Sequence, residues 1–242
     1  MGRIEKKMKF AYFGYRDWTY KLLANLNNTN FDIDAYTVKE TEYPNLDIKG
    51  KLIQVINLEE INKLDLKKYQ ALFFYGWSWI LPQNIINNNI CVCLHPSPLP
   101  KYRGGSPIQH QMIKGENESA VTLFKITQGI DNGPIYYQEK FSLDGDLSDI
   151  LDKIASIGSN LTKNLIKDFM NNSVIGYPQS EKKATSYKRR KPEESELKPD
   201  KLKNMTARQI HDFIRALQDP YPNAYILGSD GKKVYLTKSK LK

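Results

Sequence analysis

Two polar residues follow separate apolar runs of the chain, at positions where chemistry is common. His95 comes directly after the run Ile90–Leu94, and Asp131 comes five residues after the run Val121–Ile126. In open α/β sheets, ligands bind at the carboxyl ends of the strands. A carboxylate beside an imidazole orients the ring and favours its protonated form, which suits acid–base work. If the fold brings them together, these residues form a candidate acid–base site.

Each of these residues also has a purely structural interpretation. A single histidine at a strand end is more often structural than catalytic, and Asp-Asn-Gly is by itself a common turn. The loop after His95 shifts this balance, because prolines at positions 96, 98 and 100 stiffen it. Gly104 and Gly105 then permit another segment to approach closely. A rigid loop that follows a histidine favours the catalytic interpretation.

The two segments together resemble a known family. HPSPLPKYRGGSPIQ, which begins at His95, and QGIDNG, which contains Asp131, are similar to the folate-dependent formyltransferases. That family includes enzymes that act on methionyl-tRNA, on glycinamide ribonucleotide and on nucleotide sugars. The similarity is strongest over residues 70–140. It implies a Rossmann-like catalytic domain, no metal, and N10-formyltetrahydrofolate as the formyl donor.

The family pattern of Asn-x-His and a distant Asp is only partly present. His95 and Asp131 match it, but Cys93 stands where the family has asparagine. An amide donates a hydrogen bond to a developing oxyanion, and loss of such a donor typically costs about 100- to 1000-fold in rate. A thiol is a weak donor. Three interpretations stay open: His95 stabilises the oxyanion alone, Cys93 itself attacks the formyl group, or the chain is inactive.

The resemblance also implies where the folate binds. Its contacts are expected in the loop Ser78, Trp79 and Ile80, and in the segment Thr127, Gln128, Gly129, Ile130 and Asp131. Backbone amides of these loops can pair with the edge of a pterin, so the side chains need not be polar. The alternative is that Trp77 and Trp79 are buried aromatic residues with no ligand.

The carboxyl-terminal part of the chain bears on the formyl acceptor. The stretch Tyr187–Glu194 (YKRRKPEE) resembles a segment of the nucleotide-sugar formyltransferases, and a related stretch occurs in the tRNA enzymes. The residues after Met205 predict one helix and one hairpin, too little for the barrel that the tRNA enzymes carry. We therefore expect a nucleotide-linked amino sugar as acceptor. The alternatives are a tRNA-directed enzyme with a shortened tail and a non-catalytic module that binds folate or sugar.

Several basic and small residues are candidates for binding this acceptor. They are Arg103, Gly104, Gly105, Arg189 and Arg190. Arg189 and Arg190 suit a phosphate, because guanidinium groups bind phosphate oxygens well. Surface charge without a ligand is the commoner explanation for such residues.

The net charge of +9 comes entirely from the last quarter of the chain. Lys182–Lys242 contains 16 Lys/Arg and 7 Asp/Glu, whereas the first 181 residues contain 20 of each. A basic tail suggests an acidic partner, either nucleic acid or a phosphorylated small molecule. A solvated appendage is an equally good explanation of most of these charges. Given the acceptor expected above, we do not expect nucleic acid as the partner.

The composition predicts a cytoplasmic protein. No stretch approaches the roughly 20 apolar residues that span a bilayer, and the apolar run after Met8 is too short for a signal peptide. Two cysteines and three histidines in the chain argue against a structural zinc site. A reducing compartment fits this cysteine usage.

Strands that alternate with helices predict an α/β fold, with a mostly parallel, Rossmann-like sheet and helices on both faces. No Gly-rich dinucleotide fingerprint follows the first strand.

The expected domains are a catalytic domain (1–180), a charged linker (181–204) and a small helix-hairpin subdomain (205–242). The hairpin is too short to be stable alone, so we expect it to pack on another surface and the chain to form a homodimer. The expected strands are Lys9–Tyr15, Phe31–Thr37, Leu52–Leu58, Gln70–Tyr75, Ile90–Leu94, Val121–Ile126, Ile135–Phe141, Ala224–Leu227 and Lys233–Leu236, and the expected helices Tyr20–Leu26, Pro107–Ile113, Leu147–Met170 and Thr206–Leu217.

Overall fold

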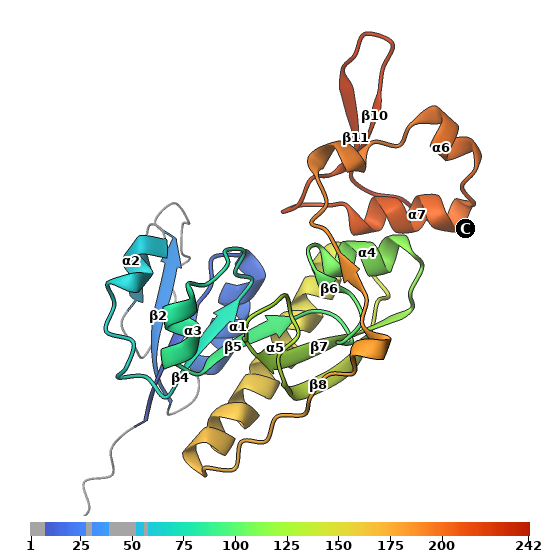
Figure 1. Ribbon diagram of the computed structural model, residues 1–242. Helices are drawn as coiled ribbons and strands as arrows, with labels where there is room; N and C mark the ends of the chain where they lie inside the picture. The colour runs from blue at the N-terminus through green and yellow to red at the C-terminus, as the bar shows by residue number, and fades with distance from the viewer. Residues whose placement is uncertain (1–7, 28–30, 39–51, 56–57) are drawn as a thin grey trace, which may run out of the picture. The chain divides into compact units, whose positions relative to one another are not determined.

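Seven strands form one mixed sheet in the order β3-β2-β1-β4-β5-β7-β8 (Figure 1). The computed structural model describes residues 8–27, 31–38, 52–55 and 58–242. Residues 56 and 57 of the predicted strand Leu52–Leu58 lie outside this part of the chain. The strands of the sheet are β1 (Lys9–Phe13), β2 (Asp32–Val38), β3 (Leu52–Val55), β4 (Ala71–Tyr75), β5 (Cys91–His95), β7 (Glu118–Lys125) and β8 (Ile135–Ser142).

The central strands are apolar along their whole length, as expected of parallel strands covered on both faces. In β4 every residue is buried, and in β1 all but the first are buried. β1 pairs in parallel with β2 and β4, β2 with β3, and β4 with β5. β7 is different, because it runs antiparallel to β5 and places Thr122 opposite His95.

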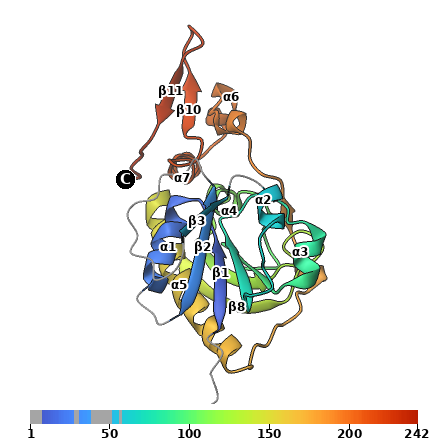
Figure 2. The same cartoon turned by 90° about the vertical axis from the view of Figure 1, so that its left-hand side faces the viewer.

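Helices cover both faces of the sheet (Figure 2). The helices α1 (Asp17–Asn27) and α5 (Leu147–Met170) lie on one side, and α2 (Leu58–Asn62) and α3 (Gln83–Asn88) on the other. On the second side, Ile61 of α2 and Ile85 of α3 share a buried cluster with residues such as Phe13 and Phe74. The predicted fold class, a mostly parallel Rossmann-like sheet with helices on both faces, is confirmed.

The described chain divides into two compact units. The first contains Met1–His95, Val121–Glu139 and Ile154–Gln179, and the second contains Pro96–Ala120, Lys140–Lys153 and Ser180–Lys242. The second unit contains α4 (Pro107–Ile113), α6 (Pro199–Lys203), α7 (Ala207–Ala216), the short strands β6 (Arg103–Gly104) and β9 (Ser186–Tyr187), the hairpin strands β10 (Ala224–Leu227) and β11 (Lys233–Leu236), and two 3-10 turns, Glu181–Lys183 and Pro192–Ser195. The domain bounds expected from sequence stay a prediction.

In the second unit, α7 is fixed by its cap and by a buried ion pair. The Thr206 hydroxyl accepts a hydrogen bond from the backbone amide of Gln209, and the Gln209 side chain accepts one from the Thr206 amide. This reciprocal cap satisfies two free amides of the first turn. Further along, the Arg215 Nε donates to Asp212 Oδ1 over 2.6 Å, and both side chains are buried.

The stretch predicted to be a linker contains regular structure. β9 pairs in parallel with β6, and α6 occupies Pro199–Lys203. Composition did not show these elements, because both are short and polar and β9 pairs with a segment some 80 residues away in the chain. The short helices α2 and α3 were also missed by the sequence analysis. None of the helices in the described part of the chain is long and apolar enough to cross a bilayer.

Candidate active site

His95 is the last residue of β5, and only 7% of its surface is exposed. Side chains of a strand alternate between the two faces of a sheet, so Cys91, Cys93 and His95 share one face. This is the face that carries the Phe13 and Phe74 cluster, which also contains Cys91. An imidazole at a strand end, with little access to water, is well placed to act on a ligand above the sheet edge.

Asp131 reaches His95 from a loop of the same unit. The His95 Nδ1 and Asp131 Oδ2 atoms are 3.5 Å apart, within ion-pairing distance. β7 ends at Lys125, which pairs with Val92 and not with His95. The loop therefore folds back from the far end of β5 to bring Asp131 to the imidazole.

The loop that carries Asp131 is held by two devices. The Gln179 Nε2 donates hydrogen bonds to the backbone oxygens of Asp131 and Gly133, each over 2.8 Å. At Gly133 there is no room for a side chain, because an added Cβ would collide with the Lys125 carbonyl oxygen. Asp131 itself has a φ of 50°, a conformation that aspartate tolerates better than most residues. The loop is thus fixed in the shape that presents the carboxylate to His95.

Cys93 lies two residues before His95 and is partly buried. Burial, together with the nearby Asp131 carboxylate, raises the pKa of the Cys93 thiol well above its ordinary value. The Sγ atom lies 3.6 Å from the Leu94 carbonyl oxygen as a weak donor. A thiol that keeps its proton at neutral pH is a poor nucleophile, because the thiolate is the reactive form.

Replacement of Cys93 by serine is therefore expected to leave the rate of formyl transfer within about threefold, because the neutral thiol does not attack. Steady-state assays of both proteins measure this rate. In the Cys91→Ser background, alkylation of Cys93 by iodoacetamide should stay slow up to pH 8. Loss of nearly all activity in the serine variant, with a formyl thioester detected on the wild-type protein by mass spectrometry, would show that Cys93 is the nucleophile.

The loop after β4 contains Ser78, Trp79 and Ile80, which were predicted to contact folate. Trp79 is 37% exposed and Ile80 is 89% exposed. The Trp77 and Trp79 rings meet edge to face, with centroids 4.8 Å apart. Trp77 packs into the sheet cluster, so the interpretation as a buried aromatic residue fits Trp77 but not Trp79, which is exposed. The loop thus exposes the apolar side chains of Trp79 and Ile80 to solvent, next to the Trp77 ring that packs against the sheet.

Two residues of this region were missed by the sequence analysis. Arg16 donates hydrogen bonds from Nε to the Gly76 carbonyl (3.1 Å) and from Nη2 to the Ser78 hydroxyl (3.0 Å). Tyr15 stacks on Trp79, with ring centroids 5.9 Å apart. Both follow β1, which is a parallel neighbour of β4, so their strands end at the same sheet edge. The adjacency of β1 and β4 is the signal that could have identified both residues from the sequence.

The second predicted folate segment, residues 127–131, forms the start of the loop that ends at Gly133. Ile130 is 68% exposed, and Gln128 and Gly129 are exposed as well. The Thr127 hydroxyl donates to the Asn132 Oδ1 over 3.0 Å, which closes the loop. Backbone groups and one apolar side chain are therefore the surface that this segment offers to a ligand.

In the second unit, Arg103, Gly104 and Gly105 lie against other residues of the same unit. Arg103 is buried and forms two parallel hydrogen bonds with Glu181, of 2.8 and 2.9 Å. A Cβ on Gly104 would collide with the Tyr187 carbonyl oxygen, and one on Gly105 would lie 2.5 Å from the Arg189 amide nitrogen. These three residues hold the segment that contains β9, and a role in binding an acceptor stays a prediction.

Arg189 and Arg190 follow β9 and differ in their surroundings. Arg189 is exposed. Arg190 is half-buried, donates from Nη2 to the Glu194 carbonyl over 2.6 Å, and has its guanidinium 5.8 Å from the Phe213 ring centroid. Burial lowers the pKa of the Arg190 guanidinium. Its Nε is buried and has no hydrogen-bond partner among the described residues. Arg190 thus keeps one donor that the fold does not use.

Among the described residues, no group of three or more His, Cys, Asp or Glu side chains is arranged to hold a metal ion. The side chains at the end of β5 that can take part in chemistry are the His95 imidazole, the Asp131 carboxylate and the neutral Cys93 thiol. This set can hold and move a proton and can donate a hydrogen bond to an oxygen that gains charge.

Comparison with known proteins places these features in a family. The formyl transferase family model matches residues 40–165, just over half of the chain, and the model of the formyl transferase C-terminal domain matches residues 201–242. The first match contains β5, His95 and Asp131. The second contains α7 and the hairpin.

Several curated relatives of the chain are named methionyl-tRNA formyltransferases. The protein from Lactobacillus gasseri is 34% identical over 151 residues, which is 62% of this chain and 46% of that protein. The chain spans about half the length of the first curated relatives it matches.

Solved structures with the same fold cover nearly the whole chain. A 4-N formyltransferase from Francisella tularensis has a TM-score of 0.80 at 20% identity, and the match covers 98% of this chain and 99% of that one. The methionyl-tRNA formyltransferase from Clostridium thermocellum has a TM-score of 0.72 at 26% identity, with 94% and 96% covered.

Proposed function

This chain belongs to the formyl transferase family, and from that premise we propose that it transfers a formyl group from N10-formyltetrahydrofolate to the amine of a nucleotide-linked amino sugar. The observation that carries the proposal is the pair His95 and Asp131, 3.5 Å apart at the end of β5. The sequence around both residues matches the family, and the structure provides loops with exposed apolar side chains in the same unit.

The proposed reaction is an acyl transfer with no covalent enzyme intermediate. The amine nitrogen of the acceptor attacks the formyl carbon, a new C–N bond forms, and the carbonyl oxygen gains negative charge. His95 donates a hydrogen bond to this oxygen, and Asp131 orients the imidazole. The bond from the formyl carbon to N10 of the folate then breaks, and the proton lost by the amine passes to N10. A neutral Cys93 thiol fits this route because no step needs a nucleophile from the protein.

The two predicted folate loops support a folate as donor. Trp79, Ile80 and Ile130 expose apolar surface, which a pterin and its aromatic extension would cover. Tyr15 and Arg16 brace the first loop, and Gln179 braces the second. Bracing reduces the ordering cost of ligand binding, so both loops are suited to a rigid planar ligand.

A nucleotide-linked amino sugar, such as a 4-amino-4,6-dideoxyhexose, is the proposed acceptor. The Francisella tularensis 4-N formyltransferase has the same fold over the full length of both chains. The segment matched by the C-terminal family model forms α6, α7 and a two-stranded hairpin. The exposed guanidinium of Arg189 would provide contacts for a diphosphate.

Methionyl-tRNA is the second candidate acceptor, and two observations favour it. Curated relatives from Lactobacillus gasseri and Lactobacillus acidophilus, 34% and 30% identical to this chain, are named methionyl-tRNA formyltransferases. The basic excess of the chain lies in its last quarter, which also suits the phosphates of a nucleic acid.

The decisive experiment compares the two acceptors directly. The purified chain receives N10-formyltetrahydrofolate and either a thymidine-diphosphate-linked 4-amino-4,6-dideoxyhexose or methionyl-tRNA, and mass spectrometry detects the formylated amine. We expect kcat/KM for the sugar to exceed that for the tRNA by about 100-fold or more. The reverse ratio would assign the tRNA. Folate binding without formylation of any amine would leave only a binding module.

We also propose that the chain forms a homodimer through its hairpin. Four apolar side chains of β10 and β11 are 37% to 56% exposed: Ile226, Leu227, Val234 and Tyr235. A two-stranded hairpin is marginally stable on its own, so burial of these side chains against a second copy would stabilise it. A monomer mass by light scattering at assay concentration would contradict this arrangement.

A further inference from the structure

A cavity lies in the first unit, at the opposite end of the sheet from His95. Its volume is about 450 Å3, within the usual range of small-molecule sites. Among its lining residues are Gln70, Ile90, Lys125, Tyr136, Phe169 and Val174. Gln70 precedes β4, Ile90 precedes β5, and Lys125 ends the antiparallel β7. The cavity therefore opens beside the amino ends of β4 and β5.

Strand register separates this cavity from the candidate active site. Lys125 pairs with Val92, and paired residues point to the same face, so Lys125 lies on the opposite face from Cys93 and His95. Ile90 lies five residues before His95, a distance of roughly 16 Å along an extended strand. Phe169, from α5, belongs to the helix layer on the face away from the His95 side. A ligand in the cavity would not touch the imidazole.

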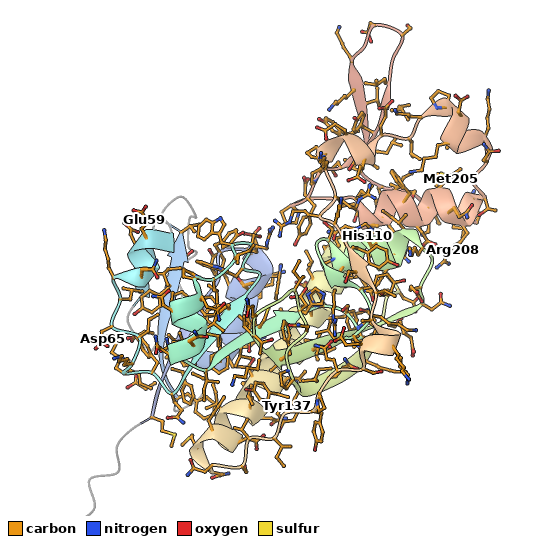
Figure 3. The ribbon with its side chains drawn as sticks, viewed as in Figure 1. Glu59, Asp65, His110, Tyr137, Met205 and Arg208 are labelled. Atoms are coloured by element: carbon orange, nitrogen blue, oxygen red, sulfur yellow. The ribbon has the colours of Figure 1, made fainter. Side chains whose placement is uncertain are left out.

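Four polar side chains line the cavity: Lys125, Gln70, Tyr136 and Asn172. In the described part of the chain, none of these four side chains makes a hydrogen bond or an ion pair. The next residue, Tyr137, which is labelled in Figure 3, is different, because its hydroxyl donates a hydrogen bond to Asp168 over 2.5 Å. Burial raises the pKa of the Cys91 thiol to about 12, and Lys125 opposes this effect. The Lys125 ammonium is thus the one positive charge among the residues that line the cavity.

The rest of the lining is apolar and contains an aromatic pair. The Tyr136 and Phe169 rings meet edge to face, with centroids 6.4 Å apart, and Ile90 and Val174 add aliphatic surface. Aromatic rings prefer offset or edge-to-face partners, so this wall suits a third ring. One cation with three neutral polar groups (Gln70, Tyr136 and Asn172) matches a monovalent carboxylate. A phosphate dianion would need more positive charge than the single lysine supplies.

We propose that this cavity is a binding site for a small aromatic monocarboxylate, whose carboxylate meets Lys125 and Tyr136 and whose ring packs between Phe169, Ile90 and Val174. The carboxylate would compensate the lysine charge, and the ring would displace water from the apolar wall. The site is distinct from the one assigned to formyl transfer and does not depend on that assignment.

The test uses phenylacetate as the probe and its neutral amide, phenylacetamide, as the matched control ligand. Titration of the 15N-labelled full chain, followed by amide shifts, should show saturable binding of phenylacetate, with the largest shifts at residues that line the cavity, such as Ile90 and Gly176. We expect phenylacetamide to bind about tenfold more weakly or worse, because it cannot pair with the lysine. His95→Ala should not change either affinity.

Two variants and one control locate the binding. Lys125→Met keeps the apolar stem of the side chain and should weaken phenylacetate binding about tenfold, to the level of the amide. Tyr136→Phe should weaken it about threefold to tenfold, through one lost hydrogen bond. Tyr137→Phe, whose hydroxyl binds Asp168, should leave it unchanged. Equal binding of acid and amide, shifts outside the cavity, no saturation, or insensitivity to Lys125→Met would overturn the proposal.

Discussion

Replacement of His95 by alanine is expected to lower kcat for formyl transfer by about 100- to 10,000-fold, the range usual for loss of a positioned acid or base. The imidazole lies at the end of β5, and it can both donate a hydrogen bond to the oxyanion and exchange a proton with the substrates. Because the substrates would contact mainly the loops, KM for the folate should change by less than kcat. Steady-state kinetics with formylated product as the readout measures both.

Two variants separate catalysis from folding in this experiment. Asp131→Asn keeps the shape of the side chain and removes the charge that orients His95, so we expect a smaller loss, of about 10- to 100-fold. His211→Ala is the matched control, because that ring lies in the second unit, where it is hydrogen-bonded to Ser239, and should leave kcat unchanged. Wild-type kcat in the His95 variant, with an intact fold by circular dichroism, would remove the residue from the mechanism.

Replacement of Gly133 by alanine is expected to lower the free energy of unfolding by about 3 kcal/mol, at the upper end of overpacking effects. The added methyl group would meet the Lys125 carbonyl oxygen and the Thr127 hydroxyl, and the former is backbone that cannot rotate away. For a chain of this length the change corresponds to a melting temperature lower by roughly 6 to 12 °C. Thermal denaturation followed by circular dichroism measures it.

The same substitution should reduce activity more than a purely global effect would. Gly133 closes the loop that carries Asp131, so a shift of the loop moves the carboxylate away from His95. Gly231→Ala is the control: that glycine has a φ of 76° but nothing within 4 Å of an added Cβ. It should cost only the conformational penalty of about 1 kcal/mol and leave kcat unchanged. Equal stability of the two alanine variants would show that the loop adapts.

The sequence was sufficient to predict most of the sheet and its helices, because the signals were long and local. The apolar runs that became β4 and β5 are continuous, and the periodic pattern of α5 extends over 24 residues. The short elements were missed for the opposite reason. α2 and α6 have five residues each, and a pattern of that length does not distinguish a helix from a polar loop.

The pairing of His95 with Asp131 could be predicted from the sequence, but the contacts that hold the surrounding loops could not. His95 and Asp131 were paired because both follow strands, and the structure does bring them together. The route is different from the one that two parallel strands would give, since β7 is antiparallel and the loop returns along β5. Gln179 and Arg16 could not be assigned from spacing, because their contacts with Asp131 and Ser78 join segments 48 and 62 residues apart. Their catalytic consequences, like those of His95 and Asp131, stay predictions.

The glycine pair after Arg103 affects how mutagenesis of this protein should be interpreted. Gly104 and Gly105 leave space that the backbone of Tyr187 and Arg189 fills, and Arg103 is joined to Glu181 just upstream. A larger residue at either glycine would displace the basic segment that follows, even though the new side chain never met an acceptor. Weakened acceptor affinity in such a variant would therefore be explained by a displaced Arg189 segment as well as by a lost contact, and would not by itself assign the glycines to acceptor recognition.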